Sequence, residues 1–200
     1  MGNISHNADE KRDRVVAAAT NVFLRYGFYR TTMADIAKAA GMSRPALYLL
    51  FPGKEDIFAA VVLGITRRLV LESRNELPNY PTLKAKLLFV CEKWAGDGFE
   101  LIEKHPDAAD MFDLRFPPVR AMYEESQVLF AEVLADAVEV SDSEGTKEDL
   151  ARLLAYSFRG FKEAAADGAD MRRMIRLQVL LLARALAKSA QARPRRTKSS

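Results

Sequence analysis

The chain has 200 residues, of which 49% are hydrophobic and 28% are charged, and its formal net charge is +3. This is an ordinary globular composition, long enough to bury a core. The single Cys91 excludes an internal disulfide and is typical of a reducing compartment. No apolar run approaches the roughly 20 residues that span a bilayer, and the N-terminal segment lacks the apolar core of a signal peptide. We therefore expect a cytoplasmic protein.

Alanine and leucine abound and β-branched runs are few, which predicts an all-α protein. Helical spacing, caps and breaks indicate about nine helices. We expect four parts, which are a disordered leader over residues 1–8, a three-helix domain over residues 9–57, a larger helical domain over residues 58–190, and a basic disordered tail over residues 191–200.

The first predicted helix covers residues 9–26 and ends at Gly27. Thr32 and Asp35 form a capping-box pattern at the start of the second helix. Ser43 is a natural N-cap for the third helix. The sequence thus marks the start of each of these two short helices with a polar cap.

Residues 32–51 hold two short helical patterns that are separated by a tight break at Gly41. Two helices joined by a short glycine-containing turn form a helix-turn-helix, whose second helix enters the DNA major groove. Ala37 is small where the two helices must cross closely, and Pro45 falls in a first helical turn, where proline is tolerated. Spacing and residue type therefore predict a DNA-binding motif here.

Basic residues stand at three consecutive predicted helix starts, namely Arg30, Arg44 and Lys54. A cation beside the positive end of a helix dipole is unfavourable by about 0.3–1 kcal/mol. A phosphate at the same place is held by free backbone N–H groups as well as by the cation. Any one of these residues alone is explained as an exposed charge, but three together favour phosphate contacts.

Arg44 is the best candidate to read a base, because its guanidinium can bond O6 and N7 of guanine together. Tyr48 is expected at the exposed edge beside the core residue Leu47. The predicted phosphate contacts are Thr32, Tyr48 and Lys54, with Thr31 as a lesser candidate. The predicted groove contacts are Ser43, Arg44, Pro45 and Ala46.

This stretch resembles the tetracycline-repressor (TetR) family of bacterial transcription regulators. The matching residues are Gly27-Phe28, Thr31-Thr32, Ile36-Ala37, Ala40-Gly41-Met42-Ser43, Leu47-Tyr48, Phe51 and Lys54-Glu55-x-Ile57. Two positions depart from the family pattern, since Pro45 stands where glycine is frequent and Leu50 where His or Tyr is common. The resemblance implies an N-terminal helix-turn-helix DNA-binding domain, a C-terminal helical ligand-binding and dimerisation domain, and a homodimer. The dimer would form through the last two helices, here about residues 147–165 and 171–190.

The second half contains longer helical patterns. The predicted helices are residues 54–76, 82–104, 107–114, a long one that opens at Pro117-Pro118, one that a capping box at Thr146 and Asp149 begins, and 171–190. The last helix is apolar on more than one face, which indicates burial both by the core and by a second subunit. Burial within one chain is the alternative.

Aromatic and methionine side chains of the second half are candidate liners of a pocket for an apolar or aromatic effector. The alternative is that they are ordinary core residues. The candidates are Trp94, Phe99, Met111, Phe112, Phe116, Met122, Tyr123, Phe130 and Phe158. The candidate polar anchors are Arg115, Arg120, Glu124 and Arg159.

An enzyme is not expected, because the chain has two histidines, one cysteine, no glycine-rich phosphate loop and no metal-spaced cluster. Asp107, Asp110 and Asp113 are interpreted as a solvated acidic helix start rather than a cation site. No cofactor or metal is expected. The expected function is a repressor that binds a palindromic DNA operator as a homodimer and is released by a small effector. The alternative is a helical dimerisation or adaptor protein without a ligand response.

Overall fold

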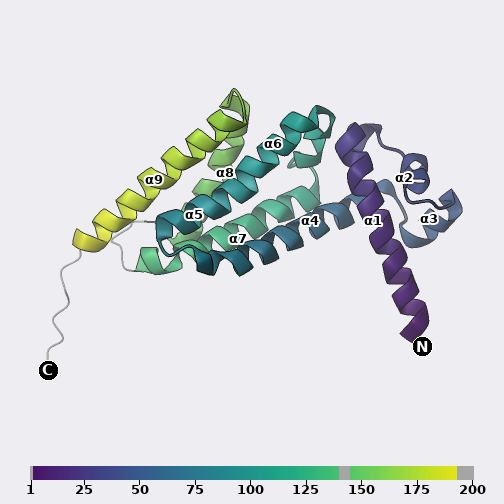
Figure 1. Cartoon of the computed structure of the whole chain (residues 1–200), viewed down its shortest axis with the longest axis horizontal. Coiled ribbons are helices and arrows are strands. Elements are labelled where there is room, and N and C mark those ends of the chain that lie inside the picture. Colours follow the sequence, from purple (N-terminus) through teal and green to yellow (C-terminus); the bar gives the residue numbers. More distant parts are fainter. Residues whose placement is uncertain (1, 140–144, 193–200) are drawn as a thin grey trace. The chain divides into compact units, whose positions relative to one another are not determined.

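The structure, a computed structural model, describes residues 2–139 and 145–192 (Figure 1). Every regular element in these ranges is a helix, which confirms the all-α prediction. None of the helices that it describes is long and apolar enough to cross a membrane. The basic tail beyond residue 192 and most of the expected loop at residues 140–145 lie outside the described residues.

Nine α-helices and three short helical segments make up the described chain. The α-helices are α1 (Gly2–Arg30), α2 (Met33–Ala39), α3 (Arg44–Leu50), α4 (Lys54–Glu76), α5 (Leu83–Cys91), α6 (Asp97–Lys104), α7 (Pro117–Glu139), α8 (Lys147–Ala164) and α9 (Gly168–Ala192). The short segments are η1 (Leu77–Asn79), η2 (Glu92–Gly96) and η3 (Pro106–Phe112). Because η2 is a single π-helical stretch between α5 and α6, the helix expected over residues 82–104 is continuous but changes its winding midway.

Two helix boundaries differ from expectation. Helix α1 begins at Gly2, so residues 2–8, which were expected to be disordered, are helical. Extending an existing helix requires no new nucleus, which explains why a polar leader can continue one. Helix α9 begins at Gly168, inside the turn expected at residues 167–170, because the Asp167 carboxylate accepts a hydrogen bond from the Asp170 N–H at 2.8 Å and so caps the first turn.

The chain forms two compact units, and they do not follow the expected division at residues 57 and 58. The N-terminal unit comprises residues up to 68 together with residues 104–122, and the C-terminal unit comprises residues 69–103 together with the described residues from 123 onward. The reason is that η3 packs against α1 and that Phe116, which follows η3, packs against Phe28 and Phe58. Local sequence patterns do not reveal these long-range contacts.

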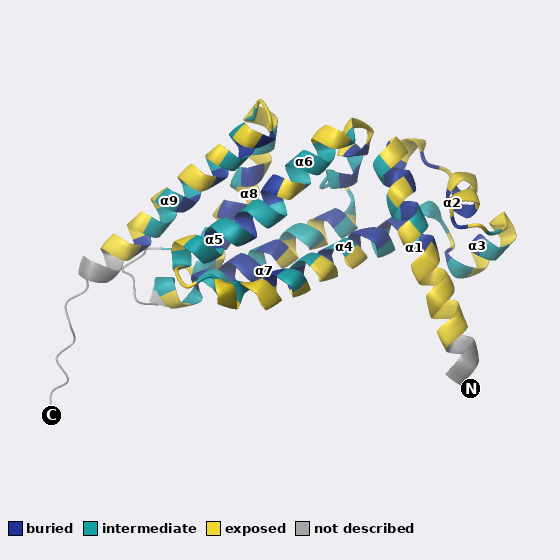
Figure 2. Ribbon diagram, viewed as in Figure 1, coloured by how far each residue is buried: buried dark blue, intermediate teal, exposed yellow. Residues whose placement is uncertain are grey.

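The N-terminal unit is built around buried faces of α1 to α4. Leu47 is the buried anchor of α3, and Phe51, which ends that helix, is also buried. The other buried apolar side chains include Val15, Ala19, Phe23, Ile36, Ala37, Ile57 and Phe58. Burial of one face fixes α2 and α3 against α1 and leaves their opposite faces to solvent (Figure 2).

The C-terminal unit has a separate core that joins α5, α7, α8 and α9. Its buried residues include Leu87, Val90, Leu129, Phe130, Leu134, Leu154, Phe158, Met171, Ile175 and Val179. Cys91 is fully buried in this core, and burial raises the pKa of its thiol. Cys91 is therefore a small apolar core residue here.

Candidate DNA-binding site

Helix α2 begins with the expected capping box. The Thr32 hydroxyl accepts a hydrogen bond from the Asp35 N–H at 3.2 Å, and the Asp35 carboxylate accepts one from the Thr32 N–H at 2.9 Å. The Thr32 hydroxyl and backbone N–H both donate to Asp35 and hold the pKa of its carboxyl below the ordinary value. The box fixes where α2 starts and keeps the Thr32 side chain exposed at that end.

The turn between α2 and α3 depends on one glycine. Gly41 has φ 66°, a left-handed conformation that glycine adopts without strain. The Met42 N–H then donates to the Ala37 carbonyl at 3.0 Å, which closes the end of α2. Ser43 caps α3, since its hydroxyl accepts a hydrogen bond from the Ala46 N–H at 3.3 Å. These local hydrogen bonds fix where α2 ends and where α3, the second helix of the motif, begins.

One side of α3 is open to solvent. Ser43, Arg44 and Pro45 are exposed and Ala46 is half-buried. Tyr48 is 47% exposed, as expected for a residue at the edge of the helix. Arg44 has no hydrogen-bond or ion-pair partner within residues 2–139 and 145–192. The predicted groove residues therefore share an accessible surface that contains an uncommitted guanidinium.

Lys54 lies in a different environment, at the point where α4 begins. Its Nζ donates to the carbonyl oxygens of Phe28 at 2.8 Å and Thr31 at 2.9 Å, and lies 4.3 Å from the centroid of the Phe28 ring. The Tyr29 carbonyl is a further acceptor at 3.4 Å. This ammonium group therefore satisfies the carbonyl groups left free at the end of α1.

The backbone on the other side of that bend is held by a carboxylate. Gly27 has φ 75° and ψ 169°, which breaks the regular winding of α1. Beyond it, the N–H groups of Phe28 and Tyr29 donate to the Asp110 carboxylate at 2.9 and 3.0 Å. Asp107 also pairs with Arg30. We call this arrangement of Gly27–Thr31, Lys54, Asp107 and Asp110 the α1 clasp.

The α1 clasp includes three residues that were predicted to contact phosphate, namely Arg30, Thr31 and Lys54. Lys54 donates to protein carbonyl groups, so this geometry does not support it as a phosphate contact. Thr31 is only 2% exposed and its hydroxyl donates to the Gly27 carbonyl at 2.6 Å, which makes it structural as well. Arg30 is paired rather than free.

Asp107 and Asp110 in η3 and Asp113 directly after it were predicted to be a solvated acidic helix start. Two of them belong to the α1 clasp, and Asp113 pairs with Arg115. Within the described ranges, no group of three or more His, Cys, Asp or Glu is arranged to hold a metal ion. These carboxylates bind backbone N–H groups and guanidinium groups of the protein itself.

The nine candidate effector-pocket residues are divided between the two units. Met111 is buried in the N-terminal unit, where Phe116 lies 4.7 Å from Phe28 and 5.1 Å from Phe58, ring centroid to ring centroid. Phe130 and Phe158 are core residues of the C-terminal unit, with ring centroids 6.1 Å apart. Of the others, Phe112 and Met122 belong to the N-terminal unit, and Trp94, Phe99 and Tyr123 to the C-terminal unit.

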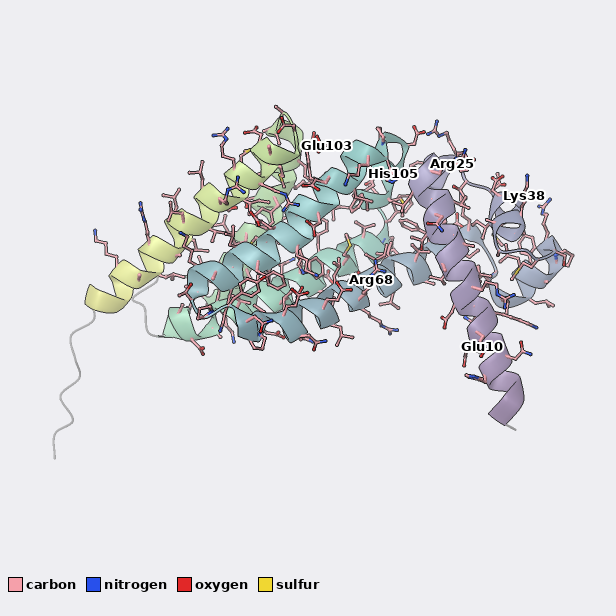
Figure 3. All side chains as sticks on the ribbon, in the orientation of Figure 1. Glu10, Arg25, Lys38, Arg68, Glu103 and His105 are labelled. Atoms are coloured by element: carbon pink, nitrogen blue, oxygen red, sulfur yellow. The ribbon has the colours of Figure 1, made fainter. Side chains whose placement is uncertain are left out.

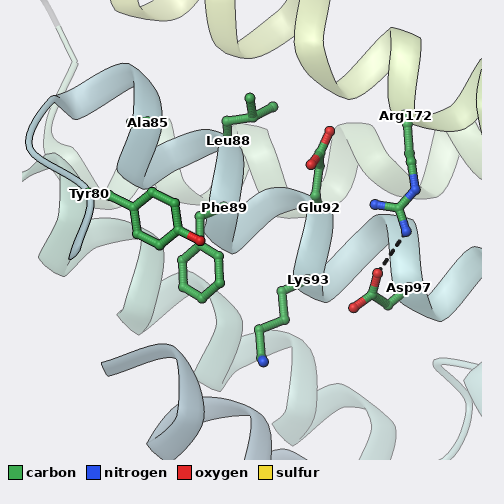
Figure 4. Close-up of a pocket in the computed structure, with 8 residues that line it drawn as sticks. All are labelled: Tyr80, Ala85, Leu88, Phe89, Glu92, Lys93, Asp97 and Arg172. Carbon is green, nitrogen blue, oxygen red and sulfur yellow. Dashed lines mark hydrogen bonds and ion pairs between the residues drawn. The ribbon is translucent and has the colours of Figure 1, made fainter. Parts of the chain in front are cut away.

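A groove of about 350 Å³ in the C-terminal unit is lined by other residues (Figure 4). The Tyr80 and Phe89 rings stack at 4.5 Å, and Arg172 donates to Asp97 and Glu100, each at 2.8 Å. The remaining lining residues are Ala85, Leu88, Glu92 and Lys93. Sequence reasoning missed this groove, because its aromatic pair is formed across the break at residues 78–81. Its basic residues are paired with protein carboxylates, so the groove offers stacking surface but no free charge.

The helix-turn-helix region matches a family of known proteins. The family model described as "Bacterial regulatory proteins, tetR family" matches residues 15–61, which include α2, the Gly41 turn and α3. Residues 15–61 therefore match the DNA-binding region of this family, and the curated relatives are named as HTH-type transcriptional regulators. The family and these relatives are DNA-binding transcriptional regulators rather than enzymes.

Two curated relatives are named as an HTH-type transcriptional regulator and an HTH-type transcriptional activator. An uncharacterized HTH-type transcriptional regulator of Mycobacterium tuberculosis is 24% identical over 172 residues, which cover 86% of this chain and 88% of the relative. The HTH-type transcriptional activator FasR of Mycolicibacterium smegmatis is 36% identical over 69 residues, which cover 34% of this chain and 32% of the relative. The stronger identity is thus confined to a short region.

A solved structure extends the similarity in fold over most of the chain. The transcriptional regulator FadR of Bacillus subtilis, determined in complex with stearoyl-CoA, matches with a TM-score of 0.65 at 19% identity. The match covers 86% of this chain and 97% of FadR. At this identity the likeness concerns the fold alone, and it includes the helices of the C-terminal unit that have no family motif in their sequence.

Proposed function

We propose that this tetR-family chain is a repressor that binds a palindromic operator as a homodimer and is released by a small effector. The observation that carries the proposal is the exposed face of α3, on which Arg44 has no partner in the described chain while Leu47 is buried behind it. Affinity for DNA comes largely from phosphate contacts, whereas side chains that reach base edges provide specificity. The exposed Arg44 guanidinium, on a helix that Leu47 anchors to the core, suits the recognition of base edges.

We assign the contacts accordingly. Arg44 reads a guanine through O6 and N7, and Ser43, Pro45 and Ala46 meet the groove beside it. Tyr48 and Thr32 bind phosphates through their hydroxyl groups. Lys54 and Thr31 leave this set, since their polar atoms bind the α1 clasp.

Dimerisation through α8 and α9 is supported by apolar side chains that the single chain leaves open. Leu153 and Leu181 are 62% and 67% exposed, and Tyr156 and Leu177 are also exposed. Leu153 and Tyr156 border a surface hollow of about 470 Å³ on α8. Burying these residues between two copies would remove them from water, which is the main favourable contribution to such an interface. A dimer also explains a palindromic operator, because protein and DNA then share a two-fold axis.

An effector with an apolar body and a hydrogen-bond acceptor suits the interior of the C-terminal unit. Trp94 Nε1 and Ser73 Oγ are buried there, and neither has a hydrogen-bond partner among the described residues. A buried polar group without a partner is unfavourable by about 1–3 kcal/mol, so an acceptor that reaches Trp94 would gain that amount. The complex of the relative FadR makes stearoyl-CoA the first compound to try.

The decisive experiment is selection of genomic DNA fragments by the purified protein, followed by binding assays on the selected site with Arg44→Ala and Arg44→Lys. We expect Arg44→Ala to weaken binding by about 1–3 kcal/mol and to relax preference at one base pair of each half-site. Arg44→Lys keeps the charge but loses the two-bond fork, so it should keep the salt dependence and lose the same base preference.

A wild-type protein that selects no common sequence would favour the dimerisation or adaptor alternative. A selected site without two-fold symmetry would contradict the homodimer. Transcription from the selected promoter, measured with and without the protein, distinguishes a repressor from an activator, the activity named for the relative FasR. Trp94 is the only tryptophan, so its fluorescence reports effector binding directly.

A further inference from the structure

The most exposed large apolar side chain of the described residues lies on α3. Leu49 is 88% exposed, and its neighbour Tyr48 is 47% exposed. Of the other exposed large apolar side chains, Leu181 reaches 67% and Leu63 48%. Isolated apolar residues on a surface need no explanation, but this one stands on the helix that carries the free guanidinium.

The spacing of α3 places Leu49 on the face proposed to meet DNA. Residues three and four apart are neighbours on a helix surface, so Leu49 lies one turn beyond Pro45, as Tyr48 lies one turn beyond Arg44. All four are exposed, whereas Leu47 is buried. The exposed face therefore pairs one strong hydrogen-bond donor with a mainly apolar surface.

Base edges in the DNA major groove are polar except at one position. The C5-methyl group of thymine is the apolar feature there, and apolar side chains recognise it by contact. Leu49 has no hydrogen-bonding atom in its side chain, so it cannot read a polar edge or hold a phosphate. Among the parts of a major groove, the thymine methyl group matches its chemistry.

We propose that Leu49 determines specificity by packing against thymine methyl groups of the operator half-site. This inference rests on the proposed function, because it requires that α3 enters the major groove. It adds an apolar recognition element beside Arg44, so each half-site contains a thymine that Leu49 contacts near the guanine that Arg44 contacts.

The test uses the full-length protein and its selected operator, with each half-site thymine replaced in turn by uracil, which lacks only the C5-methyl group. We expect one or two positions at which the replacement weakens binding by about fourfold for each methyl group lost. Leu49→Ala should bind the thymine operator more weakly by a similar factor, and at those positions it should no longer distinguish thymine from uracil.

The control is Leu63→Ala, which shortens an exposed leucine of α4 outside the motif. It should keep the full response to uracil. Alanine is a better helix former than leucine, and Leu49 is exposed, so Leu49→Ala should fold normally, which circular dichroism and thermal unfolding check. The inference is overturned if no thymine responds to uracil, or if Leu49→Ala keeps the wild-type response.

The two failures are distinguishable. A wild-type protein that selects no DNA sequence defeats the proposed function and this inference with it. A wild-type protein that binds a defined operator but ignores thymine methyl groups defeats this inference alone. An equal loss of affinity in Leu49→Ala for thymine and uracil operators would mean that Leu49 contacts the sugar-phosphate backbone, which also overturns it.

Discussion

Two regions of the N-terminal unit contain a basic residue at a helix start, but the two residues differ in their exposure and in their hydrogen-bond partners. On the open face of α3, Arg44 is exposed and has no partner among the described residues. In the α1 clasp, Lys54 is half-buried and donates to the Phe28 and Thr31 carbonyl groups. Both were predicted to bind DNA from the same sequence argument.

The difference shows that the atoms around a basic residue at a helix start decide whether it binds the protein itself or stays available for a ligand. A helix that begins beside the end of another helix meets that helix's free carbonyl groups, and a lysine there binds them. A helix that begins after an exposed turn meets only solvent, and its arginine stays available for a ligand. The predictions below test this contrast, from the largest expected effect to the smallest.

The largest effect is expected for Gly27→Ala in the α1 clasp. A Cβ atom at Gly27 would lie 2.3 Å from the Asp107 carbonyl oxygen and 3.0 Å from the Asp110 carboxylate, and φ 75° with ψ 169° is a conformation that belongs almost only to glycine. We expect the free energy of unfolding to fall by about 3 kcal/mol or more. Urea denaturation measures the change.

Gly64→Ala is the matched control for that substitution. Gly64 lies inside α4, and a Cβ atom there would meet nothing within 4 Å. Alanine should therefore stabilise the helix by about 0.5–1 kcal/mol. If Gly27→Ala proves as harmless as Gly64→Ala, the bend at Gly27 is not held as the structure has it.

A smaller loss of stability is expected for Lys54→Met, which keeps an apolar stem but removes the Nζ donor. The Phe28 and Thr31 carbonyl groups would lose a partner, so the free energy of unfolding should fall by about 2 kcal/mol. Arg44→Ala should change it by less than about 0.5 kcal/mol, because Arg44 is exposed and has no partner within residues 2–139 and 145–192. Urea denaturation of both variants compares the two regions directly.

DNA binding by the same variants provides an independent check. A lost phosphate contact lowers the slope of log K against log salt concentration by about 0.9. Lys54→Met should keep the wild-type slope when it is assayed under conditions in which it is folded. A lower slope combined with unchanged stability would restore Lys54 as a phosphate contact and remove the contrast between the regions.

Among the substitutions that remove hydrogen bonds, the smallest loss of stability is expected at the exposed capping box of α2. Thr32→Ala should lower the free energy of unfolding by about 1 kcal/mol. Thr32→Ser should retain most of the stabilisation, because serine keeps the N-cap hydroxyl. The pKa of Asp35 is lowered in the folded protein, so the contribution of its carboxylate is present at neutral pH and is lost as the pH falls below the ordinary value of 3.8. The stability difference between wild type and Asp35→Asn should therefore shrink on acidification, and a constant difference would contradict this.

Local features of the fold were predictable from the sequence. The N-caps Thr32, Ser43 and Thr146 and the glycine bends at Gly27 and Gly41 lie where the sequence placed them. These features depend on residues within about four positions of each other, and short-range hydrogen bonds decide them. The accessible face of α3 followed from the same local pattern.

Long-range partners were not predictable. Asp110 binds N–H groups 82 and 81 residues away, and Phe116 joins the aromatic cluster around Phe28. No local pattern reveals that η3 packs on α1. For this reason Asp107 and Asp110 were predicted to be solvated, and Lys54 was predicted to be available for a phosphate. Leu49 could have been found, because it lies four residues after Pro45 on the exposed face, but it was not among the predicted DNA contacts.

The shortness of α3 has a consequence for the autonomy of the motif. A helix of seven residues is not stable alone in water. Here Arg12 of α1 donates to the Leu50 carbonyl and its guanidinium lies 4.1 Å from the centroid of the Phe51 ring. The recognition helix therefore depends on contacts with α1. Residues 32–51 grafted onto another scaffold would keep the DNA-reading side chains but lose the α1 surface that stabilises the helix.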